Sequence, residues 1–480
     1  MPLNILQQSP HDLEPQTTEP LKGAKPVKWV PSRYTVRATT DDGRLVVWNT
    51  FSGAMSVFKP HQVDQIKALL RRPGVEASDG MAKYLFDRGF LIKDGTNEFR
   101  KVQLAFGQQH YRTDVLQLIL LASEDCNFRC VYCYEDFLRG TMQPWVRSGI
   151  KKYVEKRVKN LRQLGITWFG GEPLYGMPAI EDLAPFFLQI AEENSLPYRG
   201  NMTTNGYLLT DEVAAKLLAW NIVRYQITLD GRPEDHDRSR PTRDGQGSFW
   251  TIIENLKSLS RRPEDFEVVL RVNFDRQNHP HMQEFLDLIK AEVGNDPRFM
   301  VRFHGVGRWG GENDDQLDVC GSDEAAQIRM DLKQEARKRG LNIGRGLKDV
   351  LGFGSDACYA ARPFNFIVGA SGKLMKCTVA MDKDDANVVG RVTEDGDFEI
   401  DRDKFALWTE PAFESDTKCK KCVILPSCQG LHCPLVRLEE KRSPCGPNRL
   451  NLKNALRETS ELIGEGHRVA LKNEASTVVP

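Results

Sequence analysis

The fold of this chain is decided by one segment, in which Val115-Leu-Gln-Leu-Ile-Leu-Leu121 is followed closely by Cys126-Asn-Phe-Arg-Cys130-Val-Tyr-Cys133. The first part is a short apolar run, which predicts a buried strand. The cysteines then follow with the spacing C-x3-C-x2-C. Zinc takes four ligands, usually as two separated pairs, whereas three close thiolates without a nearby fourth ligand suit an iron–sulfur cluster with one open iron. The segment therefore predicts a metal cluster directly after a buried strand.

The same strand begins an alternation of strands and helices that occupies residues 111–345. The expected strands are Val115–Leu121, Thr167–Phe169, Asn201–Thr203, Tyr225–Leu229, Val268–Val272 and Met300–His304. The expected helices are Val146–Leu164, Ile180–Glu193, Asp211–Trp220, Phe249–Leu259 and His281–Glu292. Repeated strand–helix units imply a parallel sheet with right-handed crossovers. The predicted fold class is α/β, a partial (β/α)6 TIM-like barrel with its chemistry at the carboxyl ends of the strands.

Smaller regions are expected on the N-terminal side of this barrel. Residues 1–26 are rich in proline and predict a disordered tail. Residues 27–110 predict a small α+β domain, because an Asp-Gly turn separates the β-rich runs Tyr34–Arg37 and Leu45–Asn49, and helical spacing follows. This domain contains no cysteine, so we expect it to bind or to support rather than to catalyse.

On the C-terminal side, regular patterns fade over residues 346–450 while Gly, Pro and Cys become frequent. A region of this kind has little core and needs metal or disulfide cross-links. Residues 451–480 predict a helix, from Leu450 to Leu462, and a polar tail.

Composition limits the classes of function. The chain has 480 residues, with 66 Lys+Arg against 66 Asp+Glu, so it lacks the basic excess of a nucleic-acid-binding protein. No apolar run approaches the roughly 20 residues of a membrane helix. The N-terminus lacks the pattern of a secretory signal. We therefore expect a cytoplasmic protein, in which eleven cysteines indicate metal ligands or catalysts before disulfides.

Further motifs follow the later strands. Phe169-Gly170-Gly171-Glu172-Pro173 ends the second strand and Thr203-Thr204-Asn205-Gly206 the third. Thr228-Leu229-Asp230-Gly231 ends the fourth, and Asn273 lies at the end of the fifth. With the cysteine spacing and Tyr132 just before the third cysteine, this series resembles the radical S-adenosylmethionine (SAM) enzymes. Taken alone, Thr204-Asn205-Gly206 is equally compatible with a turn, and Arg240 with a surface ion pair.

The resemblance implies a cofactor and a chemistry. Cys126, Cys130 and Cys133 would hold a 4Fe–4S cluster whose fourth iron chelates the methionine part of SAM. One electron, from a donor such as flavodoxin or ferredoxin, would then release a 5′-deoxyadenosyl radical that abstracts hydrogen from the substrate. The residues expected to bind SAM are Tyr132, Gly170, Gly171, Glu172, Pro173, Thr204, Asn205, Thr228, Asp230, Arg240 and Asn273. Within this set, Glu172 suits the amino group of SAM, Arg240 its carboxylate and Asn273 its ribose.

The C-terminal cysteines resemble the SPASM extension of this family, which binds two auxiliary 4Fe–4S clusters. By that resemblance, Cys358, Cys377 and Cys433 would hold the first, and the second would be held by Cys419, Cys422, Cys428 and Cys445. Two departures stand out: four residues precede Cys433 where three are usual, and no cysteine lies between Cys358 and Cys377. The first auxiliary cluster would then have an open iron for a substrate thiolate, or Cys320 as its fourth ligand. Zinc bound by Cys419, Cys422, Cys428 and Cys433 is the main alternative.

Two groups of SPASM enzymes come into question for the reaction. Anaerobic sulfatase-maturating enzymes carry an Asp directly after the cysteine that matches Cys377, where this chain has Thr378 and reaches an acid only at Asp382. Maturases of ribosomally made peptides (RiPPs) often add an N-terminal domain that binds the leader of a precursor peptide, and residues 27–110 fit that role; the alternative is a scaffold covering the bottom of the barrel. We therefore expect a peptide maturase that installs a cross-link, first a thioether and next a C–C or C–O bond.

The other hypotheses are a formylglycine-generating sulfatase maturase and a non-catalytic, zinc-stabilised binding protein. A hydrolase lacks support, because neither His-Glu-x-x-His nor Gly-x-Ser-x-Gly occurs. No residue is assigned a catalytic role from the sequence.

Overall fold

The apolar strand β6 (Val115–Ser123) lies inside the main sheet of the computed structural model, which describes residues 28–71, 74–75, 80–137, 139–344, 352–381, 383–446, 452–454 and 456–457. Within these ranges the main sheet has ten strands in the order β11-β10-β9-β8-β7-β6-β12-β13-β14-β15. Its parallel strands after β6 are β7 (Gln163–Gly170), β8 (Gly200–Thr204), β9 (Ile222–Thr228), β10 (Glu267–Phe274) and β11 (Phe299–Gly305). Neighbouring strands in this half are successive in sequence, as expected for strand–helix units.

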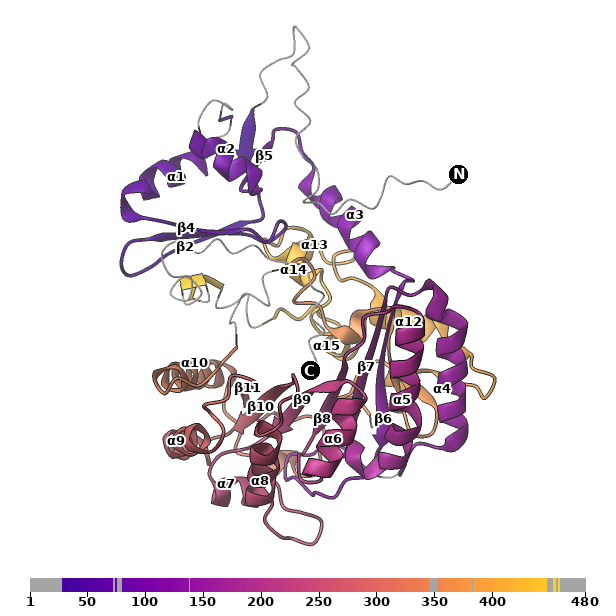
Figure 1. The fold of residues 1–480 in the computed structure, drawn as a ribbon. Coiled ribbons are helices and arrows are strands. Elements are labelled where there is room, and N and C mark those ends of the chain that lie inside the picture. Colours follow the sequence, from indigo (N-terminus) through magenta and orange to yellow (C-terminus); the bar gives the residue numbers. More distant parts are fainter. Residues whose placement is uncertain are drawn as a thin grey trace.

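Helices cover this parallel half of the sheet (Figure 1). They are α4 (Pro144–Arg157), α5 (Met177–Glu193), α6 (Asp211–Ala219), α7 (Pro233–Ser239), α8 (Phe249–Ser260), α9 (Met282–Glu292) and α10 (Ser322–Lys338). Side chains from these helices and strands form one large apolar core, which includes Trp168, Phe187 and Phe285. Burial of one apolar face per helix is what holds helices on a sheet. Within the described residues, no helix is both long and apolar enough to cross a membrane.

The strands and helices expected from the sequence are present, with one clear error. The helix expected over Val146–Leu164 ends at Arg157 and continues only as a short 3-10 turn, Val158–Asn160. Leu161 then has extended backbone angles, and Leu164 lies in β7. The error arose because apolar residues in the turn and strand continue the helical spacing by chance. The helices α7 and α10 were not predicted.

The cysteine-rich C-terminal region has more core than its sequence indicated. Strand β12 (Asn365–Val368) pairs in parallel with β6, and β13 (Lys373–Met375), β14 (Val388–Val392) and β15 (Phe398–Ile400) extend the sheet in antiparallel fashion. Phe366, Leu374 and Trp408 belong to the main core. The prediction of little core was therefore wrong for this part, because the four short strands extend the main sheet and bury apolar side chains in the main core. The remaining elements are α11 (Asp384–Asn387), α12 (Arg402–Thr409), α13 (Thr417–Lys420), α14 (Leu425–Cys428) and α15 (Pro434–Glu440).

The N-terminal region forms a separate small module (Figure 1, upper left). Its antiparallel sheet is β2 (Thr35–Thr39), β3 (Leu45–Asn49) and β4 (Met55–Phe58), so the predicted hairpin is confirmed and gains a third strand. The other elements are β1 (Trp29–Pro31), α1 (Val63–Leu69), α2 (Gly80–Asp87), β5 (Leu91–Lys93) and α3 (Glu98–His110). Residues 1–26 and most of residues 451–480, for which a tail and a helix were expected, lie outside the described residues.

The N-terminal module packs on the C-terminal cysteine region rather than under the parallel half of the main sheet. Val36 and Trp48 share an apolar cluster with Ile424 and Cys422, and Phe106 of α3 packs on Phe413. The Oγ1 of Thr50 donates to the carbonyl of Val423 at 2.6 Å, and a guanidinium nitrogen of Arg33 donates to the carbonyl of Lys420 at 2.8 Å. The alternative of a scaffold that covers the bottom of the barrel therefore has no support in these contacts.

Candidate functional site

The first cysteine group lies on the loop directly after β6, at the carboxyl end of the parallel sheet. This loop is braced by the segment after α7: the backbone N–H groups of Arg129 and Val131 donate to the carbonyls of Pro241 and Ser239, each at 2.9 Å. In return, the N–H of Arg243 donates to the carbonyl of Asn127 at 2.7 Å. The loop is therefore held in place by residues more than a hundred positions away in sequence.

Gly170 and Gly171 allow this loop to approach the end of β7. Gly170 has a φ of +127°, and a Cβ there would lie 2.0 Å from the carbonyl oxygen of Ser123. A Cβ on Gly171 would lie 2.7 Å from the carbonyl oxygen of Asp125 and 3.1 Å from the Cβ of Cys126. The two glycines thus let the end of β7 approach the end of β6 and the cysteine loop closely.

Glu172 is fully buried and joins the ends of β7 and β8. Its carboxylate accepts hydrogen bonds from Thr204 Oγ1 at 2.7 Å, from the N–H of Asn205 at 2.7 Å and from the N–H of Leu174 at 3.0 Å. Burial nevertheless raises the pKa of Glu172 above its ordinary value, against the effect of these bonds. Since a carboxylate offers about four acceptor positions, one remains for a further donor. Pro173 is buried beside it, at the start of the turn that follows.

Asn205 connects this carboxylate to the cysteine loop. Its Nδ2 donates to Asn127 Oδ1 at 2.8 Å and lies 3.9 Å from Cys126 Sγ. The interpretation of Thr204-Asn205-Gly206 as a simple turn therefore omits its main contacts, because both Thr204 and Asn205 hold Glu172 and one of them reaches the first cysteine.

Tyr132 is the centre of a second network at the ends of β9 and β10. Its hydroxyl donates to Asp230 Oδ2 and accepts from Arg240 Nη1 at 2.6 Å and from Asn273 Nδ2 at 3.1 Å. The N–H of Asn273 donates to Asp230 Oδ1 at 3.2 Å. The structure thus brings together four residues that were selected on separate motifs. Arg240 is buried and its Nε has no partner among the described residues, so a surface ion pair is the wrong interpretation for it.

Thr228 is the predicted site residue that joins neither network within the described residues. It is buried at the end of β9, where it pairs in register with Arg271 of β10.

The thiols of the first group are close enough for one thiol to raise the pKa of another. Burial is the largest cause that raises the pKa of Cys126 and of Cys130, and it raises that of Cys133 to about 12. Cys130 adds to this effect on both of the other thiols, while the Arg240 guanidinium opposes it at Cys130. Without a metal the three thiols are therefore neutral, and binding of a metal would have to release their protons.

The C-terminal cysteines separate into two groups according to which thiols raise the pKa of which others. Burial, with Cys377 and Cys433 adding to its effect, raises the pKa of Cys358 to about 12. Burial likewise raises the pKa of Cys419 to about 11 and that of Cys428 to about 12. Cys422 and Cys445 add to the rise in the pKa of Cys419, and Cys419 adds to the rise in the pKa of Cys428. These neighbours divide the seven thiols into a group of three (Cys358, Cys377, Cys433) and a group of four (Cys419, Cys422, Cys428, Cys445).

Cys320 lies in different surroundings. Burial raises the pKa of its thiol, and the groups that shift this pKa most after burial are Glu324, Arg276 and Asp275. Its place between β11 and α10, packed against the main core, fits the small packed side chain that a lone cysteine usually is.

No three His, Cys, Asp or Glu side chains within the described ranges converge on one point as the ligands of a single metal ion would. In a four-iron cluster each thiolate binds its own iron, so its ligands stand farther apart. The zinc interpretation of the C-terminal cysteines, which needs four ligands around one ion, therefore has no support in the described residues.

Several residues at this site were missed in the sequence. Arg243 pairs with Asp125, the residue just before the first cysteine, and so anchors the loop. Burial raises the pKa of Tyr134, and Cys133 of the first group and Cys377 of the group of three both add to this rise. Lys376 is fully buried and donates to the carbonyls of Arg362 at 2.7 Å and Asn365 at 2.5 Å. Burial lowers its pKa to about 7. Adjacency to a cysteine was the only signal in the sequence for Tyr134 and Lys376, and Arg243 carried no such signal.

The ends of β10 and β11 also carry basic side chains. His304 pairs in register with Asn273, and Arg302 with Arg271. Burial, with Arg271, Arg329 and Arg302 adding to its effect, lowers the pKa of His304 to about 3. This side of the site is therefore positively charged.

Part of this chain is similar to known proteins. Residues 120–289 match the family described as the Radical SAM superfamily. The radical SAM cyclopropyl synthase TigE of Paramaledivibacter caminithermalis is 27% identical over 232 residues, which are 44% of this chain and 48% of TigE. A cysteine-type anaerobic sulfatase-maturating enzyme of Clostridium novyi is 28% identical over 169 residues, 34% of this chain and 45% of that enzyme. The chain thus matches about half the length of these relatives.

A solved structure of native anSMEcpe with bound AdoMet and Cp18Cys peptide has a similar fold. It superposes with a TM-score of 0.54 at 19% sequence identity, covering 73% of this chain and 97% of that one. At this identity the likeness concerns the fold, an α/β architecture built on a large mixed sheet.

Proposed function

We propose that this chain, which carries a domain of the radical SAM superfamily, is a peptide maturase that uses SAM and a 4Fe–4S cluster to abstract hydrogen from a residue of a precursor peptide. The observation that carries the proposal is the convergence of the cysteine loop, Glu172 and the Tyr132 network at the carboxyl ends of five adjacent parallel strands. When bound, the cluster and SAM supply reductive cleavage to a 5′-deoxyadenosyl radical.

The residues present fit these groups. Three thiols on one loop are the donor set of a four-iron cluster with one open position. Arg240 offers a buried Nε without a partner among the described residues, which suits the carboxylate of SAM. Glu172 retains one acceptor position for its amino group. We assign Gly170, Gly171, Pro173, Thr204 and Asn205 to shaping this pocket, and Tyr132, Asp230 and Asn273 to holding Arg240 and the ribose side. Thr228 is the weakest member of the set.

Two auxiliary clusters form part of the proposal. The group of three thiols and the group of four correspond to the division expected from the SPASM resemblance. The group of three would leave one iron open, and the surroundings of Cys320 argue against its filling that position. An open iron could hold a substrate thiolate, so a thioether is the first cross-link to test, before a C–C or C–O bond.

The sulfatase-maturating alternative is less well supported. Thr378 stands directly after Cys377, where those enzymes carry an Asp as base. It is buried, and its hydroxyl lies 2.8 Å from that of Tyr359. A hydroxyl in this setting does not accept a substrate proton as a carboxylate does. The other acid considered, Asp382, lies outside the described residues.

The partners follow from this function. A precursor peptide with a leader would be the substrate, and this proposal takes some support from a relative that is named a maturase, the mycofactocin maturase MftC of Mycolicibacterium smegmatis. A flavodoxin or ferredoxin would supply the electron. We place the reaction in the cytoplasm, where thiols remain reduced.

The function is tested by reconstituting the protein anaerobically with iron and sulfide. With SAM and dithionite it should form 5′-deoxyadenosine, and the variant Cys126→Ala/Cys130→Ala/Cys133→Ala should form none. The unmodified protein should bind about twelve iron atoms per chain and the variant about eight. Undiminished nucleoside formation by the variant would refute the site.

The same preparation tests the binding-protein alternative. A zinc-stabilised, non-catalytic protein would be colourless, would contain zinc and would lack iron. Mass spectrometry of a candidate peptide then separates the reactions, because a cross-link removes two hydrogens from the peptide mass.

A further inference from the structure

Two positively charged side chains lie beside the group of three thiols. Lys376, the residue before Cys377, is fully buried, and Arg362 follows Cys358 after one short turn, Tyr359–Ala361. We propose that these two cations are positioning residues that make a cluster bound at the group of three easier to reduce than a cluster bound at the group of four. The proposal rests on the proposed function, which supplies the two auxiliary clusters.

Lys376 has no contact with water, so the protein itself must stabilise its charge. Its Nζ donates to the carbonyl oxygens of Arg362 at 2.7 Å and Asn365 at 2.5 Å. The Nζ also lies 5.2 Å from the ring centre of Phe366 and 5.0 Å from that of Phe405, two stacked rings with 16° between their planes. Carbonyl oxygens and ring faces both attract an ammonium group, but neither carries a full negative charge.

Arg362 is held by neutral groups in the same way. Its Nη2 donates to the carbonyl oxygen of Gly354 at 2.7 Å, and its Nη1 to Oε1 of the fully buried Gln429 at 3.2 Å. A guanidinium group keeps its proton in proteins, so this charge is permanent. Within the described part of the chain, neither Arg362 nor Lys376 has a carboxylate as an ion-pair partner. Cations enclosed without a counter-charge are costly.

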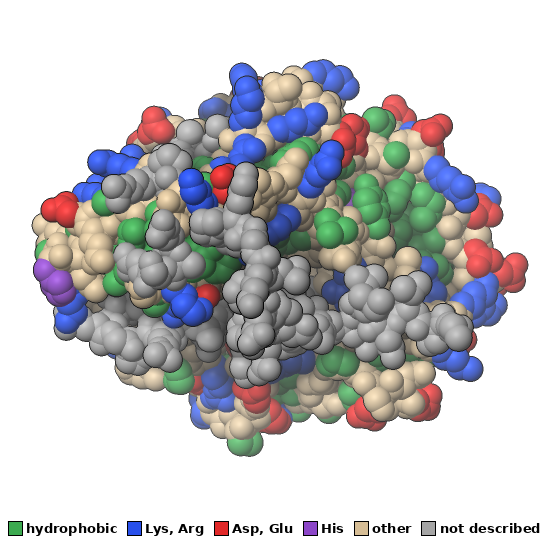
Figure 2. Space-filling view, turned by 90° about the horizontal axis from the view of Figure 1, so that it is seen from above, with side chains coloured by type: hydrophobic (Ala, Val, Ile, Leu, Met, Phe, Trp, Pro, Cys, Tyr) green, Lys and Arg blue, Asp and Glu red, His purple; other side chains and the backbone are tan. Residues whose placement is uncertain are grey.

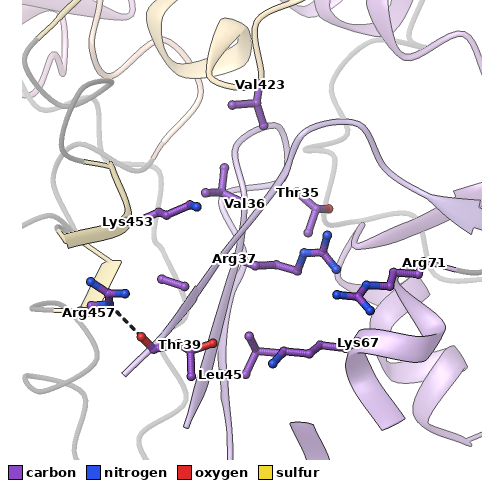
Figure 3. A pocket seen from close by; sticks show the side chains of 11 residues that line it. Thr35, Val36, Arg37, Thr39, Leu45, Lys67, Arg71, Val423, Lys453 and Arg457 are labelled. Atoms are coloured by element: carbon purple, nitrogen blue, oxygen red, sulfur yellow. Dashed lines mark hydrogen bonds between the residues drawn. The ribbon is translucent and has the colours of Figure 1, made fainter. Parts of the chain in front are cut away.

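Other groups of cations in this protein are in contact with water. Figure 2 shows Lys, Arg, Asp and Glu side chains on one face of the molecule. Basic side chains also gather around a pocket beside β2 (Figure 3), where Arg71 and Lys453 are exposed. Water stabilises charges in such places, whereas Lys376 depends on the groups packed around it. The buried cations therefore need a counter-charge that the surface cations do not need.

The negative charge that acts on both cations is that of the Cys358 thiol when it is deprotonated. Burial lowers the pKa of Lys376 and of Arg362, and Cys358 opposes this effect at each of them. Lys376 in turn opposes the rise in the pKa of Cys358 that burial causes. Because thiols release their protons when they bind a metal, a cluster at the group of three would supply the counter-charge.

The group of four has acidic neighbours instead. Asp416 caps helix α13, which contains Cys419, and its carboxylate accepts a hydrogen bond from the first turn of that helix at 2.7 Å. The N–H of Asp356 donates to the carbonyl oxygen of Ser427, the residue before Cys428, at 3.1 Å. Burial raises the pKa of both thiols, and Asp416 adds to the rise at Cys419 as Asp356 does at Cys428. The two groups of thiols thus have neighbours of opposite charge.

This difference in charge favours one of the two sites for an electron. A cluster that takes up one electron gains one negative charge, which nearby cations stabilise and nearby carboxylates destabilise. In the proposed thioether reaction, the substrate carbon first loses a hydrogen atom to the 5′-deoxyadenosyl radical. The carbon radical and the S–H group of a cysteine then form a C–S bond, with release of one proton to water and one electron. We assign the group of three as the acceptor of that electron.

Redox titrations followed by EPR spectroscopy test the proposal on the full-length, anaerobically reconstituted protein without its first cysteine group. Replacing Cys419 and Cys422 by Ala identifies the signal of the group of four. The group of three should be reduced at the higher potential. Arg362→Gln and Lys376→Met should each shift its reduction about tenfold toward the oxidised form, which is about 59 mV for one electron. The signal of the group of four should not move.

Two variants separate the effect of charge from that of structure. Arg362→Lys keeps the charge and should keep the potential of the unmodified protein. Arg298→Gln is the matched control, because Arg298 also donates to backbone carbonyls and lies 4.0 Å from the ring centre of Phe266. Its charge is already compensated by Asp296 at 2.7 Å, so its loss should shift neither signal. Equal potentials in Arg362→Lys and Arg362→Gln would overturn the role of the charge.

Thermal denaturation under anaerobic conditions adds a readout that does not involve reduction. Lys376→Met should lower the denaturation temperature of the loaded protein more than that of the metal-free protein, because only the loaded thiols compensate the buried charge. An equal decrease in both forms would show a purely structural Lys376 and would overturn its assigned role.

Failure of this inference is distinguishable from failure of the proposed function. If the unmodified protein forms no 5′-deoxyadenosine, or binds only about eight iron atoms because the group of three stays empty, the proposed function fails in whole or in part and the inference fails with it. If about twelve iron atoms bind and nucleoside forms, the proposed function stands. Unchanged potentials in both charge-removing variants, or reduction of the group of four first, would then overturn the inference alone.

Discussion

The fold brings the thiols of the first cysteine group and the C-terminal thiols together in different ways. The first group occupies eight consecutive positions on one loop, whereas the group of three is assembled from Cys358, Cys377 and Cys433. The loop is fixed by backbone bonds to residues 239–243, and the C-terminal thiols by the extension of the main sheet and the N-terminal module packed on them. One loop, braced by a distant segment, therefore brings the first three thiols together, while the dispersed C-terminal thiols depend on the whole fold.

The largest expected effect comes from removing the group of four C-terminal thiols while the first cysteine group is left intact. Replacing Cys419 and Cys422 by Ala should remove about four iron atoms and abolish peptide modification, while 5′-deoxyadenosine formation continues. The physical reason is that the proposed SAM site lies at the ends of β6–β10 and would share no ligand with these thiols. Iron analysis and nucleoside assay measure both results. If nucleoside formation disappears together with this iron, the two regions are not independent.

A glycine substitution tests how closely the first loop is packed. In Gly171→Ala the new Cβ would lie 2.7 Å from the carbonyl oxygen of Asp125, so the loop must shift. The expected cost is about 1–3 kcal/mol of folding free energy, with incomplete loading of one cluster. Chemical denaturation and iron analysis provide the readouts. The control is Gly107→Ala in α3, where a Cβ meets nothing within 4 Å and should stabilise the helix slightly.

The Tyr132 network should contribute a smaller effect. Tyr132→Phe removes the acceptor of Arg240 and Asn273 and leaves two buried donors unpaired, at a cost of about 1–3 kcal/mol. We expect the dissociation constant for SAM, measured by equilibrium dialysis, to rise about tenfold. Tyr198→Phe is the matched control, because that buried hydroxyl has no partner within the described residues. Equal SAM affinity in both variants would contradict the role of Tyr132.

The smallest effect concerns the contact between α3 and the C-terminal region. Burial lowers the pKa of His110 to about 3, and its Nε2 lies 3.0 Å from the carbonyl oxygen of Thr409. Its folded pKa is thus depressed below the unfolded value of about 6.5, so the unfolded state binds more protons and stability falls as pH drops below that value. Between pH 6.5 and 5.5 the loss should be about 1 kcal/mol.

This pH term is isolated by comparison with His110→Gln, since other buried histidines also contribute. Chemical denaturation of both proteins at the two pH values gives the difference. The same loss of stability in the variant would show that His110 is not the group responsible.

Much of the first region was predictable and much of the second was not. The cysteine spacing, the Gly-Gly-Glu-Pro segment and Asn205 are adjacent to strands that the sequence marks clearly, and the parallel sheet brings their ends together. The sequence could not reveal that Gly170 and Gly171 make room for the cysteine loop, because that contact joins segments more than forty residues apart. Nor could it show that β12–β15 extend the main sheet and share its core, because these strands are short and carry no clear alternation of apolar and polar residues.

The central claim is that Cys126, Cys130 and Cys133 hold a cluster whose open iron binds SAM. Mössbauer spectroscopy of protein reconstituted with ⁵⁷Fe tests it most directly. We predict that SAM changes the signal of one iron in about twelve, and that this change is absent when the three cysteines are replaced by Ala. A spectrum that SAM leaves unaltered, or the same change in the variant, would contradict it.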